Sequence, residues 1–473
     1  MGERWQNFIN SPSAQILLLV ALILAMRLAG LGLYPIMDTT EARYAEIARK
    51  MLQLGDWVVP MYTYEEPFWG KPPLAFWLAA VSMDIFGTNS FGARFPAWLC
   101  GVGTAFIIYS WAKPDRMLGS LAALLFVSSK LGYTATGDVT TDPYLMFAVS
   151  LAVYGFWQGY INGKSAAYFL GFVGMALGLL SKGIIAVVLI GIPIFIWLVL
   201  KAQLFTFLFD RRLLLGLLIT VVITLPWYLL MESRSPGFLQ YFIVGEHFER
   251  FVVSGWAGDK YGAGHGRPKG IISLYALDGL LPWSLLLLAF IPMIKPRWSD
   301  IRQTVTDDRW YFLIFWALSP ILVFSLASNL LSSYYMPALP ALCLLVAKAV
   351  LAVHANSTKK NLIASCVVIM ALLIPAMKFS TALISETWYN KRRNQKPIIE
   401  AFQLHPQDAP LFYIGGRRFS AEFYSAGQVR FTASFDRLNF PAYVVLPDAL
   451  DWKVPNSCEI IRASNEHTLY YCN

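Results

Sequence analysis

Residues 13–33 read SAQILLLVALILAMRLAGLGL, an apolar run that contains a single charged residue, Arg27. As an α-helix, about 20 residues of this kind cross the hydrocarbon core of a bilayer, which is roughly 30 Å thick. No small-residue cleavage site follows the run. The stretch is therefore expected to stay in the chain as a membrane-spanning helix and not to be removed as a signal peptide.

About ten further apolar runs of about 17–25 residues follow the first one. They begin near Phe91, Met117, Asp142, Ala166, Gly183, Leu213, Ile271, Trp310, Tyr334 and Asn361. Only 14% of the residues are charged, whereas a soluble domain carries about 25%. The pattern predicts a polytopic α-helical membrane protein with about eleven to thirteen spans.

The basic residues set the expected orientation. If the N-terminus is cytoplasmic, the inner loops carry an excess of Lys and Arg, which is typical of membrane proteins. These residues are Lys113, Arg116, Lys164, Lys201, Arg211, Arg212, Lys295, Arg297, Lys359 and Lys360. The net charge of +9 is spread over these loops, so no nucleic-acid partner is expected. The shorter apolar run Pro72–Phe86 carries Asp84 and is expected to lie along the membrane interface.

The C-terminal tail has a different composition. Charged residues, Pro and Gly alternate with short β-rich runs such as Leu411–Ile414 and Tyr443–Leu446. This predicts a transmembrane domain over residues 1–385 and a small soluble α/β domain over residues 386–473. Cys458 and Cys472 lie on two runs that can pair as a hairpin. They either form a disulfide in an oxidising compartment or remain buried thiols.

Acidic and basic residues gather in the segments predicted to face outward. The first such segment, about Tyr34 to Lys71, contains Asp38, Glu41 and Arg43. The other outward segments add Asp142, Lys182, His247, Arg250 and His265. Charges gathered at one membrane face suit a site that holds a lipid phosphate while an acceptor is activated.

That chemistry needs two kinds of side chain. Cations such as Lys71, Arg43 and Arg250 stabilise the phosphate that departs, and a carboxylate such as Asp38 takes a proton from the acceptor. The charges alone do not choose among these roles. The spacing of the histidines does not define a metal site. No cofactor is assigned, and the outer acids leave a divalent metal open as an alternative.

The order of short motifs resembles a known family. Glu41-Ala-Arg-Tyr-Ala-Glu46 and Lys71-Pro-Pro-Leu74 are followed by Ser181-Lys-Gly183, Glu246-His-Phe-Glu-Arg-Phe251 and Ser333-Tyr-Tyr-Met-Pro337. Each piece is weak, but the ordered series covers about three-quarters of the chain. It resembles the ArnT-like and dolichyl-phosphate-mannose-protein mannosyltransferase-like (PMT-like) membrane glycosyltransferases, which have the GT-C fold.

The resemblance implies an inverting glycosyltransferase of the bacterial inner membrane, with its active site and C-terminal domain in the periplasm. The donor would be a sugar on undecaprenyl phosphate, and the acceptor a glycolipid, another glycan or a protein. Lipid A is favoured, as for the 4-amino-4-deoxy-L-arabinose transferases. Asp38 is the implied catalytic carboxylate and Glu41 the second candidate. Substrate contacts are implied for Arg43, Lys71, Asp142, Lys182, His247, Arg250 and His265.

Departures from the family pattern include two positions in the first outward segment. Thr40 stands where many members have Asp before the Glu of the first motif, and Gly70 stands where ArnT-type members usually have Glu before Lys-Pro. The rival interpretation is a membrane transporter or a flippase for lipid-linked sugars. A transporter typically places polar residues near the bilayer midplane in repeated halves. This chain places its charges in outer segments and shows no repeat, which favours an enzyme.

Overall fold

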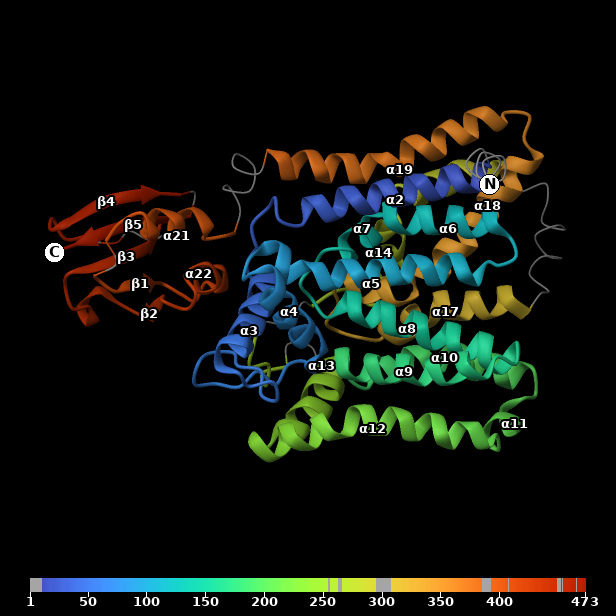
Figure 1. Cartoon of the computed structure of the whole chain (residues 1–473), viewed down its shortest axis with the longest axis horizontal. Coiled ribbons are helices and arrows are strands. Elements are labelled where there is room, and N and C mark those ends of the chain that lie inside the picture. Colours follow the sequence, from blue (N-terminus) through green and yellow to red (C-terminus); the bar gives the residue numbers. More distant parts are fainter. Residues whose placement is uncertain are drawn as a thin grey trace. The chain divides into compact units, whose positions relative to one another are not determined.

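A computed structural model shows a predominantly helical protein with a five-stranded sheet formed by residues near the C-terminus (Figure 1). The structure describes residues 11–253, 256–262, 266–294, 308–384, 393–406, 408–448, 452, 454–464 and 466–473. The chain divides into two compact units. One comprises Met1–Leu28, Pro67–Ala75 and Pro96–Met377, and the other comprises Ala29–Glu66, Phe76–Phe95 and Lys378–Asn473. The predicted domain boundary at residue 385 lies outside the described residues.

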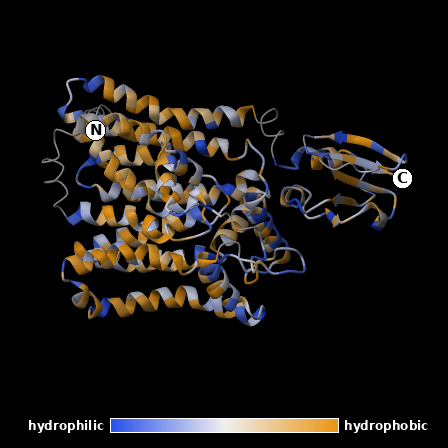
Figure 2. Ribbon diagram, turned by 180° about the vertical axis from the view of Figure 1, so that it is seen from behind, coloured by the Kyte–Doolittle hydropathy of each residue, from blue (hydrophilic) through white to orange (hydrophobic). Residues whose placement is uncertain are grey.

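The first unit is a bundle of long apolar helices. Figure 2 shows hydrophobic colouring along these helices, with hydrophilic residues concentrated toward their ends. The helices that lie wholly or mostly in this unit are α2 (Pro12–Gly30), α5 (Ser90–Trp111), α6 (Arg116–Ser128), α7 (Lys130–Ala135), α8 (Asp142–Phe156), η1 (Trp157–Ile161), α9 (Ser165–Lys182), α10 (Ile185–Leu200), α11 (Leu204–Leu208), α12 (Arg211–Arg234), η2 (Gln240–Glu249), α13 (Arg250–Val252), α14 (Ile271–Gly279), α15 (Trp283–Ile294), α17 (Asp308–Phe324), η4 (Ser332–Ala338), α18 (Leu339–Asn356) and α19 (Lys360–Leu383).

Every predicted apolar run begins within two residues of a helical element, as Ala14 against Pro12 and Gly183 against Ile185 illustrate. Within the described ranges, seven helices are long and apolar enough to cross a membrane. The pair α14 and α15 adds an eighth if it counts as one span bent by 100°. The remaining predicted runs form α6, α10 and α17, with 13, 16 and 17 residues. Long helices alone therefore give seven or more spans among the described residues, and the lower end of the expected eleven to thirteen is reached when the bent pair and the three shorter helices are counted with them.

The run that was expected to span from Met117 ends early for a local reason. Ser129 adopts an extended conformation and its side chain accepts a hydrogen bond from the Gly132 N–H, which caps the start of α7. The run therefore forms two short helices. The apolar run expected at the interface forms α4 (Leu74–Phe86), whose 13 residues cover only about 20 Å.

Helices α8 and α9 form a tight antiparallel hairpin in the first unit. A Cβ on Gly155 would lie 2.5 Å from the Gly171 Cα, and a Cβ on Gly174 would lie 2.6 Å from the Ala152 nitrogen. Small residues of this kind let membrane helices approach closely. Because the two helices run in opposite directions, the hairpin brings the first residue of α8, Asp142, beside the last residue of α9, Lys182.

The second unit contains α3 (Thr40–Leu54), α4 and the C-terminal sheet. The charged residues of α3 point into this unit. Glu46 and Lys50 are fully buried. The Lys50 Nζ lies 2.9 Å from the Glu422 carboxylate, and the Arg49 Nε lies 2.6 Å from the Glu46 carboxylate. The buried charges of α3 are therefore paired, Lys50 with Glu422 of the C-terminal region and Arg49 with Glu46 of the same helix.

The sheet has strand order β2-β1-β3-β5-β4. Strand β1 pairs in parallel with β2 and β3, whereas β5 pairs antiparallel with β3 and β4. The elements in chain order are α21 (Lys396–Gln403), β1 (Leu411–Ile414), α22 (Phe419–Tyr424), β2 (Arg430–Thr432), η5 (Phe435–Arg437), β3 (Ala442–Pro447), β4 (Cys458–Ala463) and β5 (His467–Cys472). Cys458 and Cys472 lie opposite each other on β4 and β5 and form a disulfide.

Candidate active site

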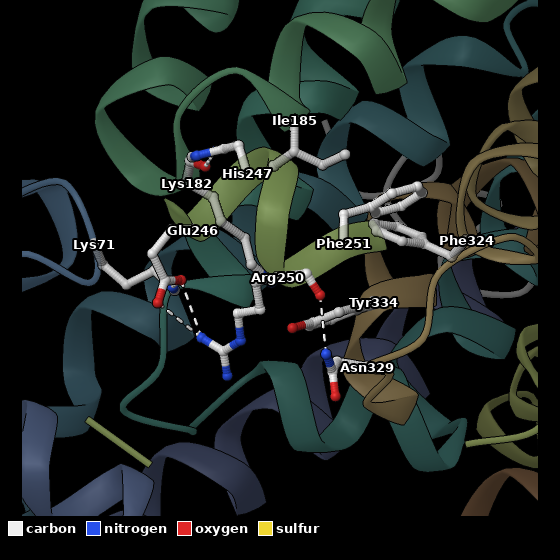
Figure 3. A pocket seen from close by; sticks show the side chains of 10 residues that line it. All are labelled: Lys71, Lys182, Ile185, Glu246, His247, Arg250, Phe251, Phe324, Asn329 and Tyr334. Carbon is white, nitrogen blue, oxygen red and sulfur yellow. Dashed lines mark hydrogen bonds and ion pairs between the residues drawn. The ribbon is translucent and has the colours of Figure 1, made fainter. Parts of the chain in front are cut away.

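A cavity of about 90 Å³ opens in the first unit, where residues from α9, η2, α13 and η4 meet the Lys71 segment (Figure 3). Its lining comprises Lys71, Lys182, Ile185, Glu246, His247, Arg250, Phe251, Phe324, Asn329 and Tyr334. The space is large enough for several water molecules, each of which needs roughly 10–15 Å³. Cations and apolar side chains share the same cavity, so it can accept an anionic group attached to an apolar chain.

Glu246 lies at the centre of the charged wall. Its carboxylate is 2.9 Å from the Lys71 Nζ and 2.9 Å from the nearer guanidinium nitrogen of Arg250. The Tyr241 hydroxyl donates to the same carboxylate at 3.4 Å. Burial opposes ionisation of Glu246, but the charges of Lys71 and Arg250 more than offset it, so the pKa of this carboxyl is lowered. Glu246 is thus an ionised counter-ion for the two cations.

Arg250 is held by its own helical neighbourhood. It follows Glu246 by four residues, which places the two side chains on one helix face. A second guanidinium nitrogen lies 3.3 Å from the Asp259 carboxylate. The Asn329 amide donates to the Arg250 carbonyl at 2.9 Å, as Figure 3 shows. These contacts fix the fork of donors that guanidinium offers to carboxylate or phosphate oxygens.

Lys182 adds a further cation to the lining of the cavity. Its Nζ lies 2.5 Å from an Asp142 oxygen and 4.2 Å from the centre of the Tyr334 ring. Gly183 follows with φ +73°, and a Cβ there would lie 2.7 Å from the Phe242 ring and 2.8 Å from the His247 ring. Only glycine fits this turn without displacing those rings.

His247 lies between two backbone carbonyls. Its Nδ1 is 2.7 Å from the Phe242 oxygen and its Nε2 is 3.0 Å from the Lys182 oxygen. Burial lowers the pKa of His247. A neutral imidazole has one N–H and donates to only one of these carbonyls. The side chain therefore fixes the end of α9 relative to η2.

The departure from the family pattern at Gly70 has a packing reason. A Cβ at this position would lie 2.8 Å from the Phe68 ring and 3.3 Å from the Tyr261 ring. The Tyr261 hydroxyl accepts the Trp69 N–H at 2.9 Å and donates to the Pro67 carbonyl at 2.8 Å. These contacts hold the segment that carries Lys71.

Four of the residues predicted for substrate contact line this cavity: Lys71, Lys182, His247 and Arg250. Asp142, also predicted, supports Lys182 from behind. His265 lies outside the described residues. In the part of the chain that the structure describes, no group of three His, Cys, Asp or Glu side chains is placed to hold a metal ion.

The other predicted residues, Asp38, Glu41 and Arg43, belong to the second unit. Asp38 accepts hydrogen bonds from the Ser420 N–H at 3.0 Å and from the Ser420 hydroxyl. Burial raises the pKa of Asp38 to about 6, although the bonds from Ser420 act in the opposite direction. A carboxylate with a pKa near 6 suits a general base.

Glu41 and Arg43 have structural contacts in the second unit. Both Glu41 oxygens accept bonds from the buried Arg94 guanidinium, at 2.7 and 2.9 Å, and the Met37 N–H donates to Glu41 at 3.0 Å. The Arg43 guanidinium carbon lies 5.5 Å from the centre of the Tyr44 ring. The contacts of Glu41 anchor the start of α3, and its catalytic role stays a prediction.

Several pocket residues were not predicted as site residues from the sequence. They are Glu246, Tyr334, Asn329 and the nearby Asp259. The spacing of Glu246 and Arg250 was a usable signal, because residues four apart on a helix pair readily. The contact of Glu246 with Lys71 joins residues 175 positions apart and leaves no local pattern.

Comparison with known proteins supports the same relationship. Residues 14–242 match the model of the family described as dolichyl-phosphate-mannose-protein mannosyltransferase. The undecaprenyl phosphate-alpha-4-amino-4-deoxy-L-arabinose arabinosyl transferase of Edwardsiella ictaluri is 30% identical over 318 residues, which are 65% of this chain and 54% of that protein. Transferase 2 of the same name from Pseudomonas fluorescens is 30% identical over 375 residues, or 74% and 60% of the two chains. This chain therefore spans little more than half the length of these curated relatives.

The fold is also shared with solved structures. ArnT from Cupriavidus metallidurans bound to undecaprenyl phosphate superposes with a TM-score of 0.77 at 18% identity, covering 97% of this chain and 98% of that one. The Archaeoglobus fulgidus oligosaccharyltransferase in its apo form has a TM-score of 0.50 at 13% identity over 91% of this chain and 69% of that one. The chain is therefore a multi-pass membrane protein with the fold of ArnT, and it is similar in sequence to the mannosyltransferase family over residues 14–242 and to the arabinosyl transferases.

Proposed function

We propose that this protein is an inverting glycosyltransferase that moves a sugar from undecaprenyl phosphate to an acceptor in the periplasm. The observation that carries the proposal is the pairing of Lys71 and Arg250 on one carboxylate, Glu246, inside a partly apolar cavity. Two cations that share one carboxylate can also share the oxygens of one phosphate. The relatives named as arabinosyl transferases and the ArnT structure with undecaprenyl phosphate support this choice of donor.

The proposed reaction breaks the bond between C1 of the sugar and the phosphate oxygen. The electron pair of that bond stays on the phosphate, which leaves as undecaprenyl phosphate with one additional negative charge. Lys71, Arg250 and Lys182 stabilise this charge. The acceptor hydroxyl attacks C1 from the opposite face, and its proton passes to a carboxylate. Asp38, the carboxylate that the family resemblance implies, is the proposed base, and its raised pKa of about 6 is compatible with that role.

The proposed acceptor is lipid A and the proposed sugar is 4-amino-4-deoxy-L-arabinose or a related pentose or hexose. The sugar comes from the names of the relatives, whereas lipid A is the acceptor that the family resemblance implies. Residence in a bacterial inner membrane, with the pocket and the sheet domain facing the periplasm, belongs to the same proposal. Other glycolipids, glycans and proteins remain alternative acceptors.

Sugar transfer in native membranes tests the proposal. We expect lipid A from cells with the wild-type chain to carry a sugar adduct, measured by mass spectrometry. Lys71→Ala and Arg250→Ala should each lower the adduct about 10- to 100-fold, since each removes a charged hydrogen-bonding partner of the phosphate. Lys130→Ala is the matched control, because Lys130 is half exposed and pairs with Asp278 outside the pocket.

Two results would contradict the proposal. An adduct that is equal in all four strains would remove the pocket from the reaction. If no acceptor gains a sugar, while proteoliposomes containing the chain carry a lipid-linked sugar from one leaflet to the other, the protein is a flippase.

A further inference from the structure

We propose that the C-terminal sheet domain orients the Asp38 carboxylate through Ser420, and that Ser420 is a positioning residue for sugar transfer. The inference rests on the proposed function in one respect, the role of Asp38 as the base. The contact itself lies within the second unit, which contains both residues.

The topology of the sheet identifies the place where Asp38 binds. The chain passes from β1 through α22 to β2 on one side of β1, and then to β3 on the other side, with all three strands parallel. In such sheets ligands bind outside the carboxyl ends of the strands, at the point where the strand order reverses. Here that point lies at the ends of β1 and β3, and the segment 415–418 leaves β1 there.

The segment between β1 and α22 has the backbone that such a site needs. Gly415 and Gly416 adopt φ values of +88° and +132°, which side-chain-bearing residues rarely adopt. Arg418 and Ser420 lie two and four residues after Gly416. In this protein the occupant is a carboxylate of the chain itself, because Asp38 accepts both the N–H and the hydroxyl of Ser420.

The hydroxyl of Ser420 has only one direction in which to donate. Ser420 is fully buried, and its Oγ accepts the Gln395 N–H at 3.0 Å. The single hydroxyl proton is therefore directed to Asp38. Gln395 is itself fixed, since its side chain accepts the Tyr413 hydroxyl at 3.1 Å and lies 3.3 Å from the His467 Nδ1. A rigid chain of hydrogen bonds in the sheet domain thus reaches the Asp38 carboxylate.

Few other charges act on this carboxylate. Arg418 on the sheet side favours its ionised form, and Tyr413 lies within electrostatic range. Arg393 contributes its backbone carbonyl, which accepts the Asp38 N–H at 2.8 Å, and its side chain is exposed. Glu41, on the same segment as Asp38, is paired with Arg94. Ser420 is therefore the polar side chain that determines where the Asp38 oxygens point and how readily they take a proton.

The pH dependence of sugar transfer distinguishes a positioning role of Ser420 from a purely structural one. In the wild type, kcat/KM should fall with acid through an inflection near pH 6, the pKa of Asp38. Ser420→Ala removes a bond to the ionised form, so the inflection should move up by about one pH unit and the rate at pH 6.5 should fall several-fold. Ser420→Thr keeps the hydroxyl and should restore the wild-type profile.

Ser425→Ala is the matched control. Ser425 is a buried serine just after the same helix, and its hydroxyl donates to the Glu422 carbonyl at 3.3 Å, not to Asp38. It should keep the wild-type inflection. An unshifted inflection in Ser420→Ala, in a protein whose sheet shows normal hydrogen exchange, overturns the inference.

A second measurement does not depend on activity. The infrared difference between the wild type and Asp38→Asn isolates the Asp38 carboxyl band, and its titration midpoint should rise in Ser420→Ala. An unchanged midpoint overturns the inference even if transfer is observed. If the titration midpoint of Asp38 rises in Ser420→Ala but the wild type transfers no sugar, Ser420 does act on Asp38 and the proposed function is wrong.

Discussion

Glu246 is an internal substitute for the phosphate that the pocket is proposed to bind. It contacts Lys71 and Arg250 with two oxygens, as a phosphate would. A donor phosphate must therefore displace this carboxylate or share the cations with it. Separating these partly buried cations from their shared counter-ion is unfavourable, so the carboxylate stabilises the unliganded pocket.

The first prediction concerns Glu246→Gln. The neutral amide removes the carboxylate that Lys71 and Arg250 share, so the unliganded variant should unfold at a lower temperature than the wild type. Undecaprenyl phosphate should restore the missing charge and raise the unfolding midpoint more in the variant than in the wild type. A thermal-shift assay in detergent measures both effects.

Glu249→Gln is the control for that experiment. Glu249 lies three residues further along η2 and does not line the pocket. Its midpoint and its response to the lipid should match the wild type. A Glu246→Gln variant with a smaller lipid response than the wild type would mean that the phosphate binds through Glu246 and not in its place.

At the scale of elements, the hairpin of α8 and α9 determines where Lys182 and Asp142 meet. The two helices approach so closely that a methyl group on Gly174 would meet backbone atoms of Ala152. Backbone cannot move aside as a flexible side chain can, so the helices would have to separate.

The second prediction is that Gly174→Ala destabilises the protein by about 1–3 kcal/mol, the usual cost of overpacking. The unfolding midpoint should fall. Binding of undecaprenyl phosphate should weaken, because Asp142 and Lys182 at the open end of the hairpin move relative to each other. Gly191→Ala is the matched control, since no atom lies within 4 Å of a Cβ built there in α10. This control should be neutral or slightly stabilising. Equal midpoints for both variants would show that the hairpin tolerates separation.

The element scale also shows what sequence reasoning can reach. Long apolar runs fix where helices begin, so the predicted and observed starts agree within two residues. Breaks inside the runs depend on single contacts, such as the Ser129 cap and the bend between α14 and α15, and were not predicted. Lys71, Lys182 and Arg250 could be named because they are charged residues next to apolar runs. The contact of Asp38 with Ser420 could not, because it joins residues 382 positions apart.

At the scale of the whole molecule, each of the two units contains candidate site residues. The cations of the pocket belong to the first unit, and Asp38 belongs to the second. The second unit also contains His467, a buried residue at the start of β5. Asp38 and His467 respond to pH in opposite directions, which gives a test on the intact protein.

The signs follow from the two pKa shifts. Burial raises the pKa of Asp38 from 3.8 to about 6 in the folded state, so its contribution to stability is present below pH 3.8 and is lost as the pH rises through 6. Burial lowers the pKa of His467 from 6.5 to about 4, so its contribution is present above pH 6.5 and is lost as the pH falls through 4. Between pH 4 and 6 the two effects oppose each other.

The third prediction is that single variants of Asp38 and His467 separate their two opposite effects on how stability changes with pH. Relative to the wild type, His467→Gln should become more stable as the pH falls from 6.5 to 4, because the cost of keeping a neutral histidine is gone while the Gln395 contact can be kept. Asp38→Asn should become less stable relative to the wild type over the same window, by about 1.4 kcal/mol per pH unit at most. Unfolding midpoints of the full chain in detergent, followed by hydrogen exchange of β1, β3 and β5, measure the differences. Taking each variant against the wild type at the same pH removes titrating groups common to both proteins. If the stability differences of the two variants from the wild type change with pH in the same direction, or each in the direction opposite to that expected, the pKa values of Asp38 and His467 do not change on folding as proposed.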